Sequence, residues 1–99
     1  MTDKGELTIR TVADNRIQSA EVYLQELIVP VGTNGIATVE ACGKCGSLQM
    51  QIVRYVIEGE AGGRFTITVH CEGQLAFEER ATIPDFFPSY DSYFRFFRI

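Results

Sequence analysis

The sequence predicts an all-β domain, a two-sheet antiparallel β-sandwich of about six to seven strands. Apolar and polar residues alternate with a period of two over several segments, which is the pattern of strands with one buried face. Short runs rich in Gly, Asn, Asp and Glu separate these segments, as turns do. At 99 residues, 45% of them hydrophobic, the chain has room for one domain with one core.

The clearest pattern is a β-hairpin near the middle of the chain. Residues 64–71 alternate strictly between apolar and polar side chains, which predicts a half-buried strand. Glu72 and Gly73 supply a two-residue turn, and residues 74–83 return with apolar residues on one face. Glu79 falls on that apolar face, and this predicts a bulge or a sheet edge close to it.

Three further segments are expected to be strands. Residues 6–12 alternate, and residues 36–42 follow a Gly-Thr-Asn-Gly turn signal at 32–35. Residues 48–57 combine alternation with many β-branched residues, which favour strands. One face of this last segment holds Leu48, Met50 and Ile52.

One segment fits two structures. Ala20, Val22 and Leu24 alternate with polar residues, as a strand requires, but an apolar stripe from Ile17 to Ile28 also fits a helix. Ala, Glu, Leu and Gln, which are common here, are good helix formers. The alternative prediction is therefore an α+β fold in which a helix at residues 16–29 covers one face of a sheet.

Two short motifs carry a resemblance to a known group of modules. A strand from Leu7 leads into polar residues 14–16, and the chain continues with Ile17 and the strand Ala20-Glu21-Val22. The turn Gly32-Thr33-Asn34-Gly35 then opens the next strand. This order resembles the repeating pattern of carboxypeptidase-regulatory-like, transthyretin-like and Cna-B-like modules.

The resemblance covers residues 6–83 and departs from the family pattern at Gly43-Lys44-Cys45. It implies a β-sandwich, and it favours a strand over a helix at residues 20–24. Modules of this group commonly act as spacers, adhesin stalk units or accessory domains beside a catalytic domain. The resemblance therefore implies a structural or interaction role, although a fold alone does not fix a function.

An aromatic-rich segment at residues 84–99 follows the predicted sandwich domain at residues 1–83. Pro84 and Pro88 interrupt the preceding strand, because proline lacks the amide hydrogen of a sheet ladder. A short helix after Pro88 and a strand over residues 93–99 both fit the segment. Seven of the eleven aromatic residues of the chain lie here: Phe86, Phe87, Tyr90, Tyr93, Phe94, Phe96 and Phe97.

These rings have two possible environments. Burying one aromatic ring contributes on the order of 1.5–3 kcal/mol, so seven rings left in water would be a large loss. The segment either folds back onto the core or sheet edge of its own domain, or it forms an interface with another protein or a second copy of the chain. Tyr, Phe and Arg, which dominate the segment, are common in protein interfaces.

The sharpest local motif is Cys42-Gly43-Lys44-Cys45-Gly46, which has the Cys-x-x-Cys spacing of a zinc knuckle. If the strands run up and down in order, the turn at 43–47 and the turn at 72–73 lie at the same end of the domain. Cys71 then becomes a third candidate zinc ligand. His70 is its neighbour on the strand and points to the opposite face, so no more than three ligands are expected.

The three cysteines leave three possibilities open. They could bind zinc, although a stable structural zinc site usually has four ligands. Cys42 and Cys45 could be a redox-sensitive pair or a disulfide. They could also be two reduced cysteines that flank a hairpin turn, with Cys71 as a small residue in the core.

Signals of catalysis, nucleic-acid binding and membrane insertion are absent from the sequence. It contains a single histidine, no Gly-x-Ser-x-Gly, no His-Glu-x-x-His and no phosphate-binding loop, so we expect no enzyme activity. The formal net charge is −4 and the basic residues are spread thinly, which argues against nucleic acid and anionic membranes as partners. No apolar run has the length of a membrane span or of a signal peptide, and the compartment is left undetermined.

The sequence therefore predicts a non-enzymatic structural or protein–protein interaction module on a β-sandwich scaffold. The expected partner is another protein or a second copy of the chain, bound through the aromatic segment, and no cofactor is required. The alternative is a small metal-binding or redox-responsive domain that uses the Cys42–Cys45 turn, with zinc as the candidate metal.

Overall fold

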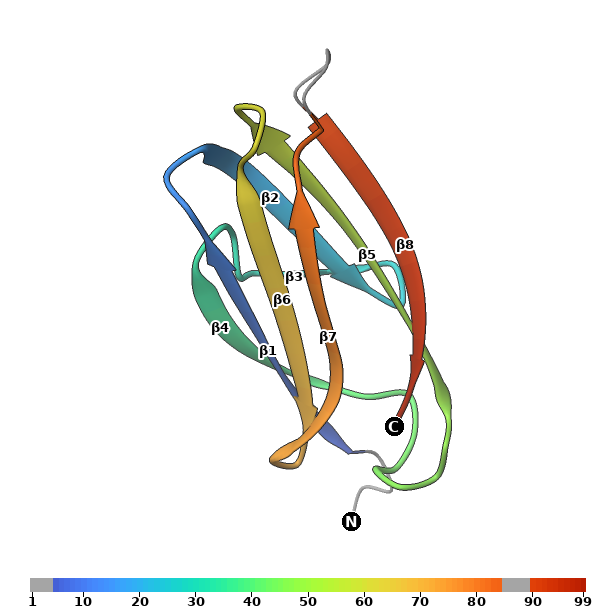
Figure 1. Ribbon diagram of the computed structural model, residues 1–99. Helices are drawn as coiled ribbons and strands as arrows, with labels where there is room; N and C mark the ends of the chain where they lie inside the picture. The colour runs from blue at the N-terminus through green and yellow to red at the C-terminus, as the bar shows by residue number, and fades with distance from the viewer. Residues whose placement is uncertain (1–4, 85–89) are drawn as a thin grey trace.

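Eight β-strands and no helix make up the regular structure of the described residues, 5–84 and 90–99, in a computed structural model of the chain (Figure 1). This part of the chain therefore includes no helical stretch that could cross a lipid bilayer. The strands are β1 (Glu6–Ala13), β2 (Ile17–Leu24), β3 (Leu27–Val29), β4 (Gly35–Glu40), β5 (Met50–Gly59), β6 (Arg64–Cys71), β7 (Gln74–Thr82) and β8 (Tyr90–Arg98).

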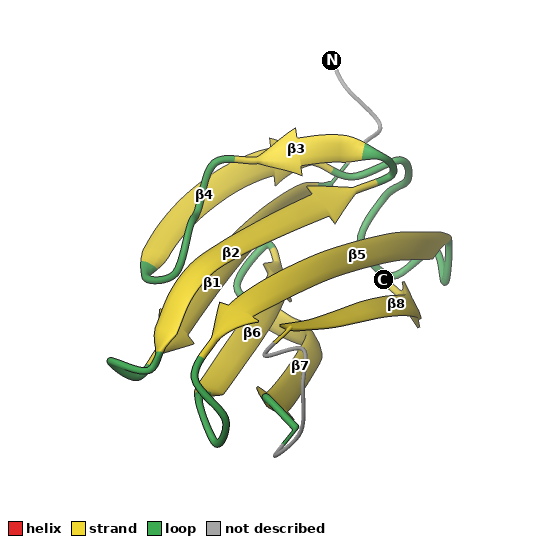
Figure 2. Cartoon of the chain, turned by 90° about the horizontal axis from the view of Figure 1, so that it is seen from above, coloured by secondary structure: helices red, strands yellow, loops and turns green. Residues whose placement is uncertain are grey.

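The strands form two antiparallel sheets of four strands that pack face to face (Figure 2). Sheet A has the order β4-β1-β6-β7, and sheet B has the order β3-β2-β5-β8. Most neighbours in a sheet are distant in sequence, since β1 lies between β4 and β6 and β2 pairs with β5. The predicted two-sheet antiparallel sandwich is confirmed, with eight strands in place of six or seven.

The ambiguous segment at residues 17–28 is a hairpin of β2 and β3, and the predicted alternative of a helix at 16–29 is wrong. Gln25 and Glu26 both have positive φ angles, of 51° and 67°, which make a tight two-residue turn. Val22 and Leu24 are buried between the sheets. Pairing of β2 with β5 therefore outweighs the helix propensity of these residues.

The predicted hairpin at residues 64–83 is confirmed as β6 and β7. Glu72 and Gly73 both have positive φ angles, 49° and 89°, as a two-residue hairpin turn of this type requires. The register of the two strands shifts between Val69 and His70. Glu79 lies on the inner face of β7, which is the edge strand of sheet A, so its position beside an edge and a register irregularity is as expected.

The core lies between the two sheets and follows from the alternation of the strands. Alternate residues of β1, β5 and β6 point inward and are buried, and each fully buried large apolar side chain contributes about 1.5–3 kcal/mol. The inner face of β5 holds Val53, Tyr55 and Ile57, whereas Met50 and Ile52 point outward. The largest fully buried apolar side chains are Tyr55, Phe65, Leu7, Ile9, Ile57, Ile67, Ile83, Val22, Val53 and Val69.

Candidate functional site

The aromatic segment folds as β8, which pairs with β5 along nine residues at the edge of sheet B. The strand predicted over residues 93–99 is therefore confirmed for residues 93–98, although β8 begins earlier, at Tyr90, and the helix interpretation is wrong there. Phe86 and Phe87 lie outside the described residues, and Tyr90 is described by its backbone alone. The other four aromatic residues divide between the two faces of the strand.

The inner face of β8 contributes to the core. Tyr93 stacks on Tyr55, with ring centroids 4.9 Å apart, and Phe97 stacks on Phe77 of β7 at 5.1 Å. Phe97 is only 7% exposed. Tyr93 and Phe97 therefore close the space between the two sheets at the edge where β7 and β8 face each other.

A polar contact lies between these two aromatic pairs. Glu79 of β7 accepts a hydrogen bond from the hydroxyl of Tyr55 and another from Nε of Arg95, the latter at 2.7 Å. Burial and the hydrogen bond to Glu79 raise the pKa of the Tyr55 hydroxyl, and the same carboxylate raises the pKa of Arg95. One carboxylate on the inner face of sheet A thus links two side chains of sheet B.

The outer face of β8 leaves two rings in solvent. Phe94 is 47% exposed and Phe96 is 57% exposed, and the rings meet edge to face with centroids 5.2 Å apart. Their cross-strand neighbours on β5 are Arg54 and Ile52. Arg54 also lies over the ring of Tyr23 on β2, with 4.1 Å between its guanidinium carbon and the ring centroid.

These rings are part of a larger surface that covers all four strands of sheet B. One row across the sheet runs from Ile28 through Tyr23 and Arg54 to Phe94. Ile28, at the far edge of this row, is 65% exposed. We call this surface the apolar face, and it consists of Tyr23, Ile28, Met50, Ile52, Arg54, Val56, Phe94 and Phe96.

The outer face of sheet A has a different character. The corresponding row across that sheet consists of Ile36, Arg10, Thr68 and Glu78, of which a single residue is apolar. Threonines and charged residues fill most of the remaining outward positions in β1, β6 and β7. An antiparallel sheet that faces water normally alternates in this way, so sheet A is ordinary and sheet B is the exception.

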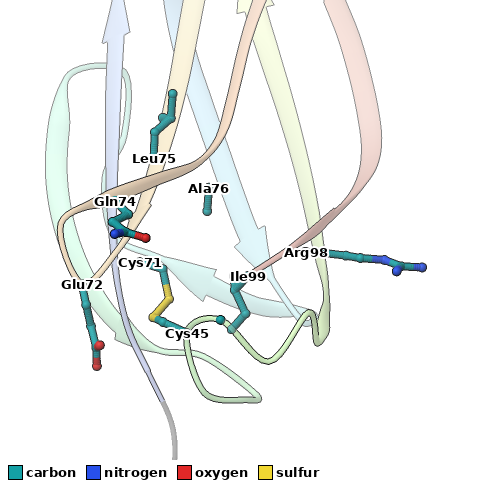
Figure 3. Close-up of a pocket in the computed structure, with 9 residues that line it drawn as sticks. Cys45, Cys71, Glu72, Gln74, Leu75, Ala76, Arg98 and Ile99 are labelled. Carbon is teal, nitrogen blue, oxygen red and sulfur yellow. A yellow bond between two sulfur atoms is a disulfide. The ribbon is translucent and has the colours of Figure 1, made fainter.

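A disulfide joins Cys45, in the turn between β4 and β5, to Cys71 at the end of β6 (Figure 3). The turns at residues 43–47 and 72–73 lie at the same end of the domain, as expected. The disulfide joins these two turns, and it does not form between Cys42 and Cys45. The disulfide borders a pocket of about 300 Å³ that is also lined by Leu75 and Ile99.

The turn that carries Cys45 also fixes both ends of the described chain. The amide of Gly5 donates a hydrogen bond to the carbonyl oxygen of Gly43, at 2.8 Å. The amide of Gly46 donates to the carbonyl oxygen of Ile99, at 2.6 Å. The start of β1, the end of β8 and the disulfide are therefore tied to one another through residues 41–49.

The third cysteine, Cys42, is an exposed free thiol held by amide groups. Its sulfur accepts hydrogen bonds from Nε2 of Gln51 at 3.0 Å and of Gln25 at 3.4 Å, and it donates to the carbonyl oxygen of Met50. Gln51 is fully buried, and its oxygen accepts from the backbone amide of Cys42. The sequence did not identify Gln51, although a polar residue at an inward position of an apolar strand is a usable signal.

The three cysteines of the predicted zinc site differ in oxidation state in this structure. Cys45 and Cys71 are oxidised to a disulfide, and Cys42 is a thiol. Within the described ranges, no three or more His, Cys, Asp or Glu side chains are grouped so that they could hold a metal ion. Zinc binding by Cys42, Cys45 and Cys71 thus stays a prediction about the reduced chain, because thiolates are the ligands.

Comparisons with known proteins add no further identification. A scan of family models, a search of curated proteins and a search of solved structures each find no match to this chain. The resemblance to carboxypeptidase-regulatory-like, transthyretin-like and Cna-B-like modules stays a prediction from the sequence.

Proposed function

We propose that this chain is a non-enzymatic protein–protein interaction module, with a β-sandwich as its scaffold and the apolar face as its binding surface. The observation that carries the proposal is the contrast between the outer faces of the two sheets. Phe94 and Phe96 expose about half of their surface in the isolated chain. Covering the exposed part of each ring would contribute roughly 1 kcal/mol or more to binding.

The composition of the apolar face supports a protein partner. Aromatic residues, Met and Arg are enriched in protein interfaces, and charged residues are depleted from their centres. The apolar face has Tyr23, Phe94 and Phe96 around Arg54, which is itself placed over an aromatic ring, and a second arginine, Arg98, lies opposite Met50 at one end of this face. Glu21 and Glu58, which carry negative charge, lie next to this surface on β2 and β5 and would form part of a polar rim.

Site-specific photo-crosslinking tests the proposal in the cells that produce the chain. A photoreactive phenylalanine analogue is introduced at Phe94, and a matched control carries it at Ile36, which is 64% exposed on the outer face of sheet A. We expect discrete crosslinked protein adducts from position 94 and none from position 36. An absence of adducts at position 94, or the same adducts at both positions, would contradict the proposal.

A redox-responsive domain is the second candidate function, and it is favoured by the free thiol of Cys42 three positions before a disulfide cysteine. The Cys42 thiolate can attack the sulfur of Cys45. A Cys42–Cys45 bond then forms, the Cys45–Cys71 bond breaks, and Cys71 leaves as a thiolate, so no outside oxidant is needed.

Alkylation followed by mass mapping of peptides tests this second candidate. If exchange occurs, raising the pH should move part of the label from Cys42 to Cys71, because the thiolate is the attacking species. A Lys44→Gln variant with the same three cysteines is the control for general reactivity. Label found on Cys42 alone across the pH range would remove this candidate.

A further inference from the structure

The Cys45–Cys71 disulfide joins a firmly held residue to a loosely held one. Cys71 is 4% exposed and ends β6, a central strand of sheet A that pairs with both β1 and β7. The turn at residues 41–49, which carries Cys45, lies outside the strands, and its side chains Lys44, Ser47 and Leu48 are exposed. If the disulfide breaks, the turn is therefore the part that can move.

Backbone hydrogen bonds link this turn to the ends of two strands. Gly43 accepts a bond from the amide of Gly5, just before β1, and Gly46 donates one to the carbonyl oxygen of Ile99, just after β8. The amide of Ile99 in turn donates to the carbonyl oxygen of Gln49, at 3.3 Å. This last bond continues the pairing of β5 with β8 by one more residue, so the turn and the end of β8 hold each other in place.

Gly5 packs directly against both sulfur atoms of the disulfide. An ideal Cβ atom placed on Gly5 would lie 2.5 Å from Sγ of Cys45, 3.0 Å from the Cys45 backbone nitrogen and 3.2 Å from Sγ of Cys71. Two thiols cannot approach as closely as two bonded sulfur atoms, so reduction requires extra room between them. Gly5 blocks one side, whereas the pocket of about 300 Å³ that both cysteines line leaves room for Cys45 to move (Figure 3).

We propose that the Cys45–Cys71 disulfide is a redox switch: breaking it releases the turn at residues 41–49 and frees the end of β8. The inference rests on the redox-responsive candidate function and deepens it, because it names the structural response. The pocket gives a small thiol access to the bond. Two molecules of this thiol supply two electrons and two protons and leave as one disulfide, and Cys45 and Cys71 become thiols.

The release reaches one end of the apolar face. Phe96 lies three positions before Ile99, and its neighbour on β5, Ile52, lies three positions after Gln49. Once the bond between Ile99 and Gln49 is lost, β8 frays from its end toward Phe96. Phe94 lies two residues further along the strand and is affected less. The reduced chain keeps the sandwich and loses order at one end of the surface proposed for binding.

Hydrogen–deuterium exchange of the oxidised and reduced chain, resolved by residue with NMR, gives the first test. The amides of Gly5, Gly46 and Ile99 donate bonds at the disulfide end, and reduction should accelerate their exchange by at least ~tenfold. The amides of Gly62 and Ile83 donate bonds at the opposite end of the sandwich and should change much less (Figure 1). The same acceleration at both ends would show a uniform loss of stability and overturn the inference.

Urea provides the matched control for this measurement. Reduction also lowers the free energy of unfolding, so the oxidised chain is measured at a urea concentration that lowers it by the same amount. Urea should not accelerate Gly5, Gly46 and Ile99 selectively over Gly62 and Ile83. If it does so as strongly as reduction does, the turn is the least stable part of the fold in either redox state, and the inference fails.

Gly5→Ala, in a Cys42→Ser background, gives the second test. The added Cβ meets the tethered Cys45 in the oxidised chain, whereas the released turn can withdraw from it in the reduced chain. The variant should therefore raise the equilibrium constant for reduction by dithiothreitol by at least ~tenfold. Gly63→Ala, whose Cβ would lie 2.9 Å from Cδ1 of Ile17, is the matched control and should leave the constant unchanged. Circular dichroism checks that both variants fold, and an unchanged constant in Gly5→Ala would show that the turn stays in place.

The switch and the candidate functions fail in different ways. If alkylation shows exchange onto Cys71 while the amides of the turn keep their protection, the redox-responsive candidate stands and the switch fails. A disulfide that is reduced only when the whole chain unfolds also removes the switch. Neither result affects the protein-interaction proposal, which photo-crosslinking at Phe94 tests separately.

Discussion

The two faces of β8 place chemically similar side chains in opposite environments. The inward Tyr93 and Phe97 stack on rings of the neighbouring strands and close the core. The outward Phe94 and Phe96 contact each other and remain about half exposed. The difference comes from the period-two alternation of a strand, which separates residues that composition groups together.

This comparison shows that one aromatic-rich strand can close the core with one face and leave rings exposed on the other. The two roles predicted for residues 84–99, core closure and an interface, are not exclusive in a strand with one face inward. A substitution on the inner face of β8 should lower the free energy of unfolding. A substitution on the outer face should weaken association with a partner.

The largest loss of stability is expected from breaking the Cys45–Cys71 disulfide. Reduction of the Cys45–Cys71 disulfide should lower the free energy of unfolding by about 3 to 4 kcal/mol, as the chain-entropy estimate gives for a sequence separation of 26. Urea unfolding with and without a reductant measures this difference. The double variant Cys42→Ser/Cys71→Ala, which keeps a single cysteine, is the control, and its stability should not respond to the reductant. Equal stabilities of the oxidised and reduced wild type would contradict the prediction.

Truncation of the inner face should have the next largest effect. Phe97→Ala removes a buried ring that packs on Phe77, and a loss of about 3 kcal/mol is expected. Phe96→Ala, one residue away on the outer face, should cost less than about 1 kcal/mol. Chemical denaturation of the pair measures both values. Similar losses in the two variants would show that the faces do not differ in this way.

The polar contact of the inner face predicts a dependence on pH. Tyr55→Phe removes one hydrogen bond to Glu79 and should cost about 1 kcal/mol near neutral pH. The pKa of Tyr55 is raised from 10.0 in the folded chain, so its contribution is present below pH 10 and is lost as the pH rises above that value. The stability advantage of the wild type over Tyr55→Phe should therefore shrink between pH 9 and pH 11.

Unfolding free energies of both proteins across this pH range, with tyrosinate absorbance as a check on ionisation, measure that change. A constant difference between the two proteins would show that the Tyr55 hydroxyl titrates as it does in the unfolded chain. Comparing the two proteins cancels the titration of the other tyrosines and the lysines.

The smallest effect on stability is expected on the outer face. Phe96→Thr keeps a residue that favours strands and should change the free energy of unfolding by less than about 0.5 kcal/mol. The same variant should reduce the photo-crosslinking at Phe94, because it removes one of the two exposed rings of the apolar face. A variant that loses stability but keeps full association would reverse the assignment of the two faces.

The sequence predicted most of the fold because the strands with strict alternation are half-buried. The hairpin at residues 64–83 is as expected, including the edge position of Glu79. The exception is Leu75, which was expected on the apolar face with Phe77 but is 59% exposed, because the register shift between Val69 and His70 turns it outward. The segment at residues 17–28 was ambiguous, because its apolar residues satisfy both periods and it includes several good helix formers. The choice between strand and helix depends on the pairing of β2 with β5. β3 was missed because three residues carry no periodicity.

The candidate site was predicted in part. The aromatic segment was found by its composition, but the other members of the apolar face lie on separate strands and meet only through the topology. Met50 and Ile52 share a face, as expected, yet that face is the outer one, and the fully buried Gln51 lies on the inner face. The meeting of Cys45 and Cys71 follows from up-and-down strands, whereas the choice among three possible pairs of cysteines could not be made from sequence.

The hydrogen bonds of Gly5 and Ile99 to the turn at residues 41–49 have a consequence for how this sandwich could be linked to other domains. A polypeptide that enters at Gly5 and leaves at Ile99 does both at the same end of the sandwich (Figure 1). In a string of domains, such a unit would project sideways and add little to the length of the string. The geometry thus suits a side branch that presents the apolar face better than it suits one segment of an extended stalk.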